Sequence, residues 1–185
     1  MNQITPVIKA PLSPKSNADI RRAQNKVIER LSADPMAART TITTTGRVGE
    51  GLACHVQQGK FETIMDMGPA MGGAAFGPSP GFFARAAVVG CVSIAVKMTA
   101  AREGLDVRTV DVKIDVDCDD LAIFALGGGD AGTLESRIAI MVETSEPDDI
   151  IADLTNRALA HAPWFLGLKE ANTVIVETHT TASLR

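Results

Sequence analysis

Apolar and polar residues alternate along several short stretches of this chain, which is the pattern of β-strands with one buried face. The clearest stretch is Val110–Cys118, in which charged residues occupy every second position and apolar residues or cysteine occupy the others. A similar pattern covers 134–142, and we expect a last strand at Thr173–Thr180. These three segments predict strands in the second half of the chain.

The first half of the chain predicts a three-stranded meander. β-Branched residues fill 41–45, and the glycines within 46–51 are typical of a turn. Apolar residues then recur at every second position in 52–56 and 61–67. In the last of these strands, Asp66 falls on the polar face. Short turns between consecutive strands favour antiparallel pairing.

Three segments predict helices. Apolar residues recur at near-helical spacing after Ser16, a residue typical of helix N-caps, until an aspartate–proline pair stops the pattern at 34–35. The segment Phe82–Glu103 is apolar on nearly every side, which predicts a helix buried all round and ended by Gly104. A third helix should begin after Pro147 and end near residues 161–163.

The expected order of elements is βββ-α-ββ-α-β, with an additional helix at the N-terminal side. Because most successive strands follow one another directly, the sheets should be mostly antiparallel and the fold class α+β. We expect residues 1–35 to form an N-terminal extension with an amphipathic helix, and residues 36–185 to form one domain. A helix that is apolar on every side is hard for one chain of this size to enclose, which favours a homodimer.

Composition narrows the function classes. The chain has 185 residues, 45% of them hydrophobic, and a net charge of −4, which is typical of a soluble globular protein. Without a cluster of lysines and arginines, nucleic-acid binding is not expected. The longest charge-free part of the most apolar segment, Ala86–Val96, is too short to span a bilayer, and the N-terminal residues lack the apolar core of a signal peptide. We therefore expect a cytoplasmic protein without a membrane segment.

The chain has three cysteines, an odd number without short spacing: Cys54, Cys91 and Cys118. This pattern does not indicate a disulfide framework or a zinc motif, and we expect no metal and no cofactor. Cys91 lies in the middle of the apolar helix, beyond the reach of the positive N-terminal end of the helix dipole. Such surroundings favour the neutral, unreactive thiol unless another element brings a cation to the sulfur atom. A buried core cysteine is the ordinary alternative.

The turn Gly77–Pro80, followed by a long apolar helix with paired phenylalanines, Gly90 and Cys91, resembles the OsmC/Ohr family of bacterial thiol peroxidases. The order of elements from about residue 39 to residue 180 is similar as well. The resemblance implies an OsmC-like fold, with mostly antiparallel sheets wrapped around two long helices, and an intertwined homodimer. It also implies an organic hydroperoxide as the substrate.

The resemblance implies roles for individual residues and shows two departures from the family pattern. Cys91 matches the peroxidatic cysteine and Arg47 the arginine that activates it. The glutamate that holds this arginine in the family falls at Gly81, and the resolving cysteine falls at Ala162, so both groups are missing. An oxidised Cys91 would then need an external thiol as reductant. The leading hypothesis is reduction of lipophilic organic hydroperoxides, and the alternative is a non-catalytic protein that binds a small apolar ligand.

Three residues near the end of the last helix are weaker candidates. His161 is either a general base near the pocket or an ordinary helix-end histidine. Trp164 and Phe165 either line an apolar pocket above Cys91 or make a core or dimer contact.

Overall fold

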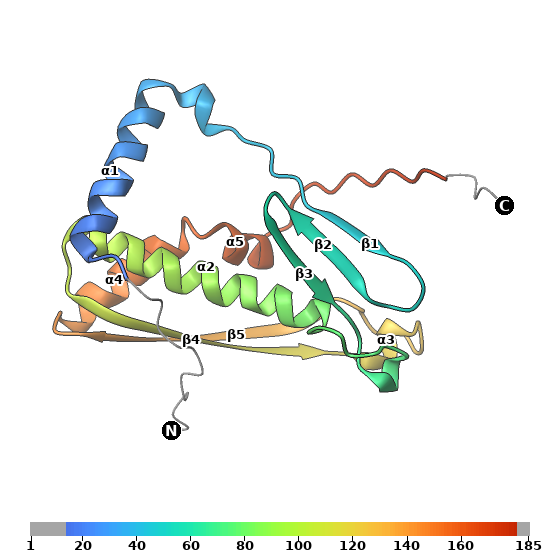
Figure 1. Ribbon diagram of the computed structural model, residues 1–185. Coiled ribbons are helices and arrows are strands. Elements are labelled where there is room, and N and C mark those ends of the chain that lie inside the picture. The colour runs from blue at the N-terminus through green and yellow to red at the C-terminus, as the bar shows by residue number, and fades with distance from the viewer. Residues whose placement is uncertain (1–13, 181–185) are drawn as a thin grey trace.

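The computed structural model describes residues 14–180, and the fold class is α+β with antiparallel sheets, as predicted (Figure 1). Three strands form a first sheet and two longer strands form a second, while five α-helices and two short 3-10 helices complete the fold. The strands are β1 (Thr45–Val48), β2 (Cys54–Gln58), β3 (Phe61–Met65), β4 (Val107–Cys118) and β5 (Thr133–Thr144). The helices are α1 (Asn17–Ala33), η1 (Pro35–Ala38), η2 (Pro69–Met71), α2 (Pro80–Glu103), α3 (Asp120–Ile123), α4 (Asp148–Leu159) and α5 (Pro163–Lys169).

Each sheet is built from neighbours in the sequence. In the first sheet, β2 pairs antiparallel with both β1 and β3, which confirms the predicted meander. In the second, β4 and β5 form a long antiparallel ribbon, and Val112 lies opposite Ile140. The apolar positions of the ribbon turn towards α2 and the charged positions turn away from it, as the alternation predicts.

The core lies between α2, the ribbon and α4. Its central cluster consists of buried side chains from these elements: Val96, Ala100, Val107, Leu154 and Ala158. Gly104 ends α2 with a φ of 81°, a left-handed conformation that glycine adopts without strain. Figure 1 shows α2 lying across the ribbon, with α4 and α5 beside it.

The prediction that α2 is buried on every side is wrong for a single chain. Val92 and Val96 are fully buried, but Ile94 on another face is 59% exposed. The elements that pack on α2 are β4, α4, α1 and α5, and together they cover only part of its circumference. By length and composition α2 would also suffice to cross a membrane, a property that the core helix of a soluble protein often shares.

Four further details differ from the sequence prediction. The first strand covers Thr45–Val48 and not residues 41–45, because the turn falls later than predicted, where Gly51 has a φ of 80°. Asp66 is buried instead of facing solvent. The segment Thr173–Thr180 is not a strand in the described chain, which offers it no partner, and Ile175 is 83% exposed. Finally, the helix Pro163–Lys169 was not predicted.

The N-terminal helix follows its sequence signals closely. The side chain of Ser16 accepts a hydrogen bond from the backbone N–H of Asp19, and the Asp19 carboxylate accepts one from the backbone N–H of Ser16, so the two form a capping box. α1 packs against the C-terminal part of α2, where Nε of Arg21 donates to the carbonyl oxygen of Ala101 at 2.9 Å. This contact joins α1 to the main body of the fold.

Candidate functional site

Cys91 lies half-buried in a groove along α2, and the groove is closed on one side by the end of α4 and the start of α5. The groove has a volume of about 510 Å³, and most of its surface is apolar. Residues three or four apart share one face of a helix, which explains why α2 contributes a continuous row to the groove. The lining residues are Ala86, Ala87, Gly90, Cys91, Ile94, Ala95, Met98, Thr99, Arg102, Ala158, His161, Pro163 and Trp164.

The turn between α4 and α5 brings two of the weaker sequence candidates to this groove. Pro163 begins α5, where its missing N–H costs no hydrogen bond, and the preceding Ala162 is completely buried as the N-cap residue. His161 and Trp164, on either side of this turn, both line the groove with Cys91. Phe165 is not among the groove residues: it lines a separate cavity with the first residues of β5, which favours the other alternative, a core or dimer contact.

Arg102 is a groove residue that the sequence reasoning missed. It lies eleven positions after Cys91, which is three turns along the same helix face. Its guanidinium donates to the hydroxyl of Thr99 at 3.2 Å. The signal that identifies it in the sequence is this eleven-residue spacing, which is three helical turns. Arg102 therefore gives the apolar groove one cationic rim.

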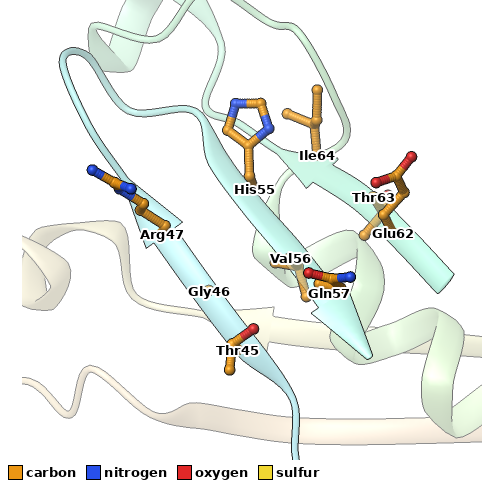
Figure 2. Close-up of a pocket in the computed structure, with 9 residues that line it drawn as sticks. All are labelled: Thr45, Gly46, Arg47, His55, Val56, Gln57, Glu62, Thr63 and Ile64. Atoms are coloured by element: carbon orange, nitrogen blue, oxygen red, sulfur yellow. The ribbon is translucent and has the colours of Figure 1, made fainter. Parts of the chain in front are cut away.

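Arg47 lies on the other sheet, in the middle of β1. Cross-strand pairing places Arg47 beside His55, and His55 beside Ile64, so that these three side chains form a row across one face of the sheet (Figure 2). Thr45, Gln57 and Glu62 form the adjacent row. Both rows line a cavity of about 520 Å³.

Within the described part of one chain, Arg47 and Cys91 line different cavities. The structure therefore brings Cys91, His161 and Trp164 together but leaves the candidate activating cation elsewhere. Among the described residues, no ion pair involves Arg47. The pairing that the resemblance implies, Cys91 with Arg47, is therefore not made within the described part of one subunit, and the cation on the groove itself is Arg102.

Gly81 lies in the first turn of α2, and a side chain from the next turn covers it. A Cβ atom at Gly81 would lie 3.1 Å from Nη1 of Arg85, because the Arg85 guanidinium folds back over the glycine. Arg85 is not among the residues that line the Cys91 groove. A side chain at Gly81 would thus begin in close contact with the Arg85 guanidinium, which would have to shift slightly.

The other two thiols lie away from the groove. Cys54 is half-buried in β2, on the opposite sheet face from His55, as the alternation predicts, and Cys118 is exposed at the end of β4. All three cysteines are free thiols. In residues 14–180 no group of three or more His, Cys, Asp or Glu side chains is arranged to hold a metal ion.

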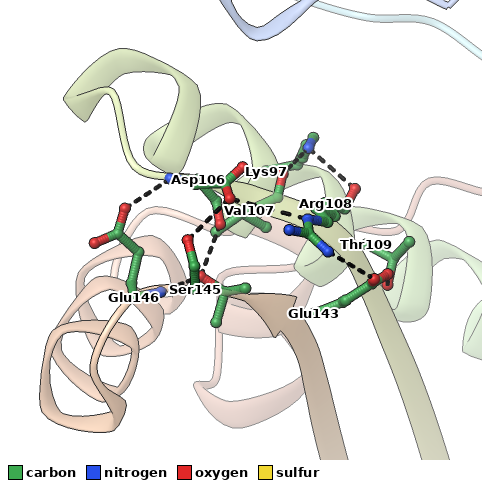
Figure 3. A network of polar contacts seen from close by, with 9 residues as sticks. Lys97, Asp106, Val107, Arg108, Thr109, Glu143, Ser145 and Glu146 are labelled. Carbon is green, nitrogen blue, oxygen red and sulfur yellow. Dashed lines mark hydrogen bonds and ion pairs between the residues drawn. The ribbon is translucent and has the colours of Figure 1, made fainter.

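A polar network joins the C-terminal end of α2 to the ribbon (Figure 3). The Lys97 ammonium donates to the carbonyl oxygens of Val107 and Arg108. The backbone N–H of Asp106 donates to the Glu146 carboxylate at 2.8 Å, which fixes the chain where it enters β4. These contacts hold the helix that carries Cys91 in place and do not reach the groove.

The matched family and structures agree with this architecture. The family model described as OsmC-like protein matches residues 72–177. A solved OsmC-like protein from Mycoplasma pneumoniae superposes with a TM-score of 0.60 at 12% identity, covering 70% of this chain and 88% of that one. An organic hydroperoxide resistance protein OsmC from Legionella pneumophila gives a TM-score of 0.51 at 14% identity, covering 70% of this chain and 90% of that one. No curated protein sequence matches.

Proposed function

This chain belongs to the OsmC-like protein family, and from that premise we propose that it reduces organic hydroperoxides with the thiol of Cys91. The observation that carries the proposal is the position of Cys91, half-buried in an apolar groove with His161 and Trp164 on its wall. The Legionella neighbour is named for organic hydroperoxide resistance, which agrees with this chemistry. A groove with mostly apolar walls favours a lipophilic hydroperoxide over hydrogen peroxide.

The proposed reaction has two steps. The Cys91 thiolate attacks the terminal oxygen of the hydroperoxide, so that an S–O bond forms and the O–O bond breaks. The sulfur is oxidised by two electrons to a sulfenic acid, and the substrate leaves as an alcohol after taking up a proton. Two thiol groups of an external reductant then restore the Cys91 thiol, with release of water and formation of their own disulfide.

The external reductant is part of the proposal because a resolving thiol is not at hand. Ala162, at the family position of the second cysteine, has no sulfur, and Cys54 and Cys118 lie on strands outside the groove. Without a dithiol, the sulfenic acid on Cys91 should therefore persist and oxidise further to sulfinic acid. A cytoplasmic location, where thiols are kept reduced, fits this requirement.

The proposal includes a homodimer in which Arg47 of the partner subunit completes the site around Cys91. Two observations support it. The groove face of α2 leaves apolar side chains such as Ile94 in contact with water in a single chain. The apolar residues Val174–Val176 are exposed in an extended segment, which a second copy of the chain would cover. A cation brought to the groove would stabilise the thiolate that attacks the hydroperoxide.

A second candidate function is non-catalytic binding of a small apolar ligand. Gly81 favours it, because the missing carboxylate and the overlying Arg85 leave Arg47 without the orienting partner of the family. In that case the groove would hold its ligand mainly by apolar contact, with Arg102 as a charged group on its rim, and Cys91 would be part of the lining.

Consumption of cumene hydroperoxide in the presence of a dithiol tests the two functions against each other. The proposal requires turnover by the native protein, loss of turnover in Cys91→Ser, and normal turnover in Cys54→Ser as the matched control. If the native protein consumes no hydroperoxide and mass spectrometry finds Cys91 still reduced, the binding function replaces the catalytic one.

A further inference from the structure

Asp66 is a buried carboxylate that the proposed chemistry does not use. It directly follows β3 and is only 2% exposed. Its oxygens accept three backbone hydrogen bonds, from the N–H of Met67 at 2.7 Å and from those of Ala74 and Phe76 at 3.1 Å each. The N–H of Phe76 is the main reason why the pKa of Asp66 lies below its ordinary value, with the other two N–H groups adding to it against the effect of burial. The charged form of Asp66 therefore ties the loop after β3 to the end of that strand.

The loop that Asp66 organises has little freedom to take another path. A Cβ atom at Gly73 would lie 1.9 Å from the carbonyl oxygen of Met67, and one at Gly77 would lie 2.1 Å from that of Ile64. Between these close approaches, Ala75 has a φ of 55°, a left-handed conformation that is strained for a residue with a side chain. A loop that keeps such strain next to a buried carboxylate is held in a defined position.

This position places Phe76 beside the candidate activating residue. The Phe76 ring is 72% exposed, so burial of the ring does not explain the shape of the loop. Phe76 lines a cavity of about 570 Å³ together with Arg47, His55 and Ile64. The loop thus adds an aromatic wall to the sheet face that carries Arg47.

We propose that Phe76 determines substrate specificity by forming the apolar wall next to Arg47, and that Asp66 is the positioning residue that keeps it there. The inference rests on the proposed function, because it takes Arg47 to be the cation beside the reacting thiol. The group recognised is an aryl or branched alkyl substituent of the hydroperoxide, which packs on the exposed ring.

Kinetics of Phe76→Ala test the wall. The KM for cumene hydroperoxide should rise about 10-fold, since an apolar contact with the substrate is lost, while kcat changes little. The kinetics with hydrogen peroxide should not change, because this substrate has no group to contact the ring. Phe61→Ala is the matched control: Phe61 is 69% exposed on the same sheet but is not among the residues that line this cavity, and its substitution should leave both substrates unaffected. An unchanged KM for cumene hydroperoxide in Phe76→Ala would overturn the proposal that Phe76 contacts the substrate.

Asp66→Asn tests the positioning. Only the amide oxygen of asparagine can accept, so at least one of the three backbone N–H groups would face the amide NH2 group instead of an acceptor. The variant should therefore raise the KM for cumene hydroperoxide as Phe76→Ala does, without affecting hydrogen peroxide. The double variant should be no worse than Phe76→Ala alone, because both changes remove the same contact. Additive effects, or an equal loss of kcat with both substrates, would overturn the positioning role and leave only a structural one.

Two measurements separate failure of this inference from failure of the proposed function. If the native protein has no turnover, the proposed function fails, but binding of cumyl alcohol, the unreactive product, still reports on the wall and should weaken in Phe76→Ala. Hydrogen exchange reports on the positioning: the amides of Ala74 and Phe76 should be protected in the native protein and should exchange faster in Asp66→Asn. If Asp66→Asn does not fold, the native protection decides alone, and unprotected amides at these positions overturn the role of Asp66.

Discussion

The groove around Cys91 and the sheet face around Arg47 differ in how they are built. The groove is formed mainly by one helix, whose side chains at Cys91, Ile94 and Met98 fall in a row because of helical geometry. The sheet face depends on pairing between three strands and on a loop that returns to it through Asp66. One region has a thiol without an activating cation from β1, and the other has that cation without a thiol. The proposed pairing of Cys91 with Arg47 therefore requires a second subunit, while the cation that the groove itself offers is Arg102.

The largest expected effect follows from removing the thiol. Cys91→Ser should lower the turnover of cumene hydroperoxide at least about 100-fold, because serine is a far weaker nucleophile than a thiolate. Cys118→Ser, an exposed thiol outside the groove, should retain full activity. Initial rates with a dithiol reductant provide the comparison, and similar losses in both variants would show that Cys91 has no special role.

Removing the cation should have the next largest effect. Arg47→Ala should slow alkylation of Cys91 at neutral pH about 10-fold, since an opposite charge nearby stabilises the thiolate by roughly this factor. Arg85→Ala is the matched control because Arg85 lies on α2 but outside the groove lining. Mass spectrometry of the labelled protein gives the rate. An unchanged alkylation rate of Cys91 in Arg47→Ala would show that Arg47 and the sheet face around it are not part of the site.

Restoring a resolving thiol tests the position of the turn before α5. In Ala162→Cys, treatment with hydroperoxide should give a disulfide between Cys91 and the new cysteine, provided that the Cβ atoms reach about 3.8 Å. The native protein should accumulate sulfenic and then sulfinic acid instead. Ala162 is fully buried, so the added sulfur atom should cost about 1–3 kcal/mol of stability, which a urea titration measures. Oxidation of Cys91 without this disulfide would show that Ala162 is not in the resolving position.

The pH dependence of the unfolding free energy tests the hydrogen bonds between the charged Asp66 carboxylate and the loop after β3. The pKa of Asp66 is lowered in the folded protein, so its contribution to stability is complete above the pKa of the unfolded chain, about 4. It is lost as the pH falls through the lower, folded value. The difference in unfolding free energy between the native protein and Asp66→Asn should therefore be present at pH 7 and shrink below about pH 4. If the difference is the same at pH 7 and below about pH 4, the charge of Asp66 does not contribute to stability as proposed.

The smallest effect is expected from restoring the missing carboxylate. In Gly81→Glu the new side chain meets Arg85, four residues later on the same helix face, and the two should pair with about 0.3–0.5 kcal/mol of stabilisation. Cys91 reactivity should then hardly change. Gly81→Glu combined with Arg85→Ala frees the carboxylate for Arg47 and should raise the alkylation rate. If Gly81→Glu alone raises the alkylation rate of Cys91, the new carboxylate does not pair with Arg85 as proposed.

The sequence predicted the parts of this molecule that depend on local patterns. The alternation in Val110–Cys118 and the apolar run before Gly104 identified β4 and α2, because strand and helix periods are visible within a few residues. Asp66 was placed on the wrong face, since its alternation could not show that a later loop folds back onto it. Burial of α2 was overestimated for a similar reason: apolar character shows that a face needs cover, but not which chain supplies it.

The same distinction applies to the candidate site. His161 and Trp164 line the groove with Cys91, although the sequence alone left each with an alternative, a helix-end histidine and a core or dimer contact. Phe165, the next residue, faces β5 instead. The sequence pattern of a short helix does not show which of two adjacent residues faces the groove. Phe76 could not be identified from the pattern, because the loop that brings it to the Arg47 cavity folds back through contacts such as its hydrogen bond to Asp66, ten positions earlier.

Subunit complementation tests most directly whether Cys91 of one subunit works with Arg47 of the partner subunit. Cys91→Ser and Arg47→Ala chains carrying different affinity tags are co-expressed, and the mixed dimer is isolated by both tags. If the site is shared, the mixed dimer contains one complete site and should show about half the hydroperoxide turnover of the native dimer. Each parent variant alone should show far less. A mixed dimer no more active than its parents, or a protein that sediments only as a monomer, would contradict the shared site.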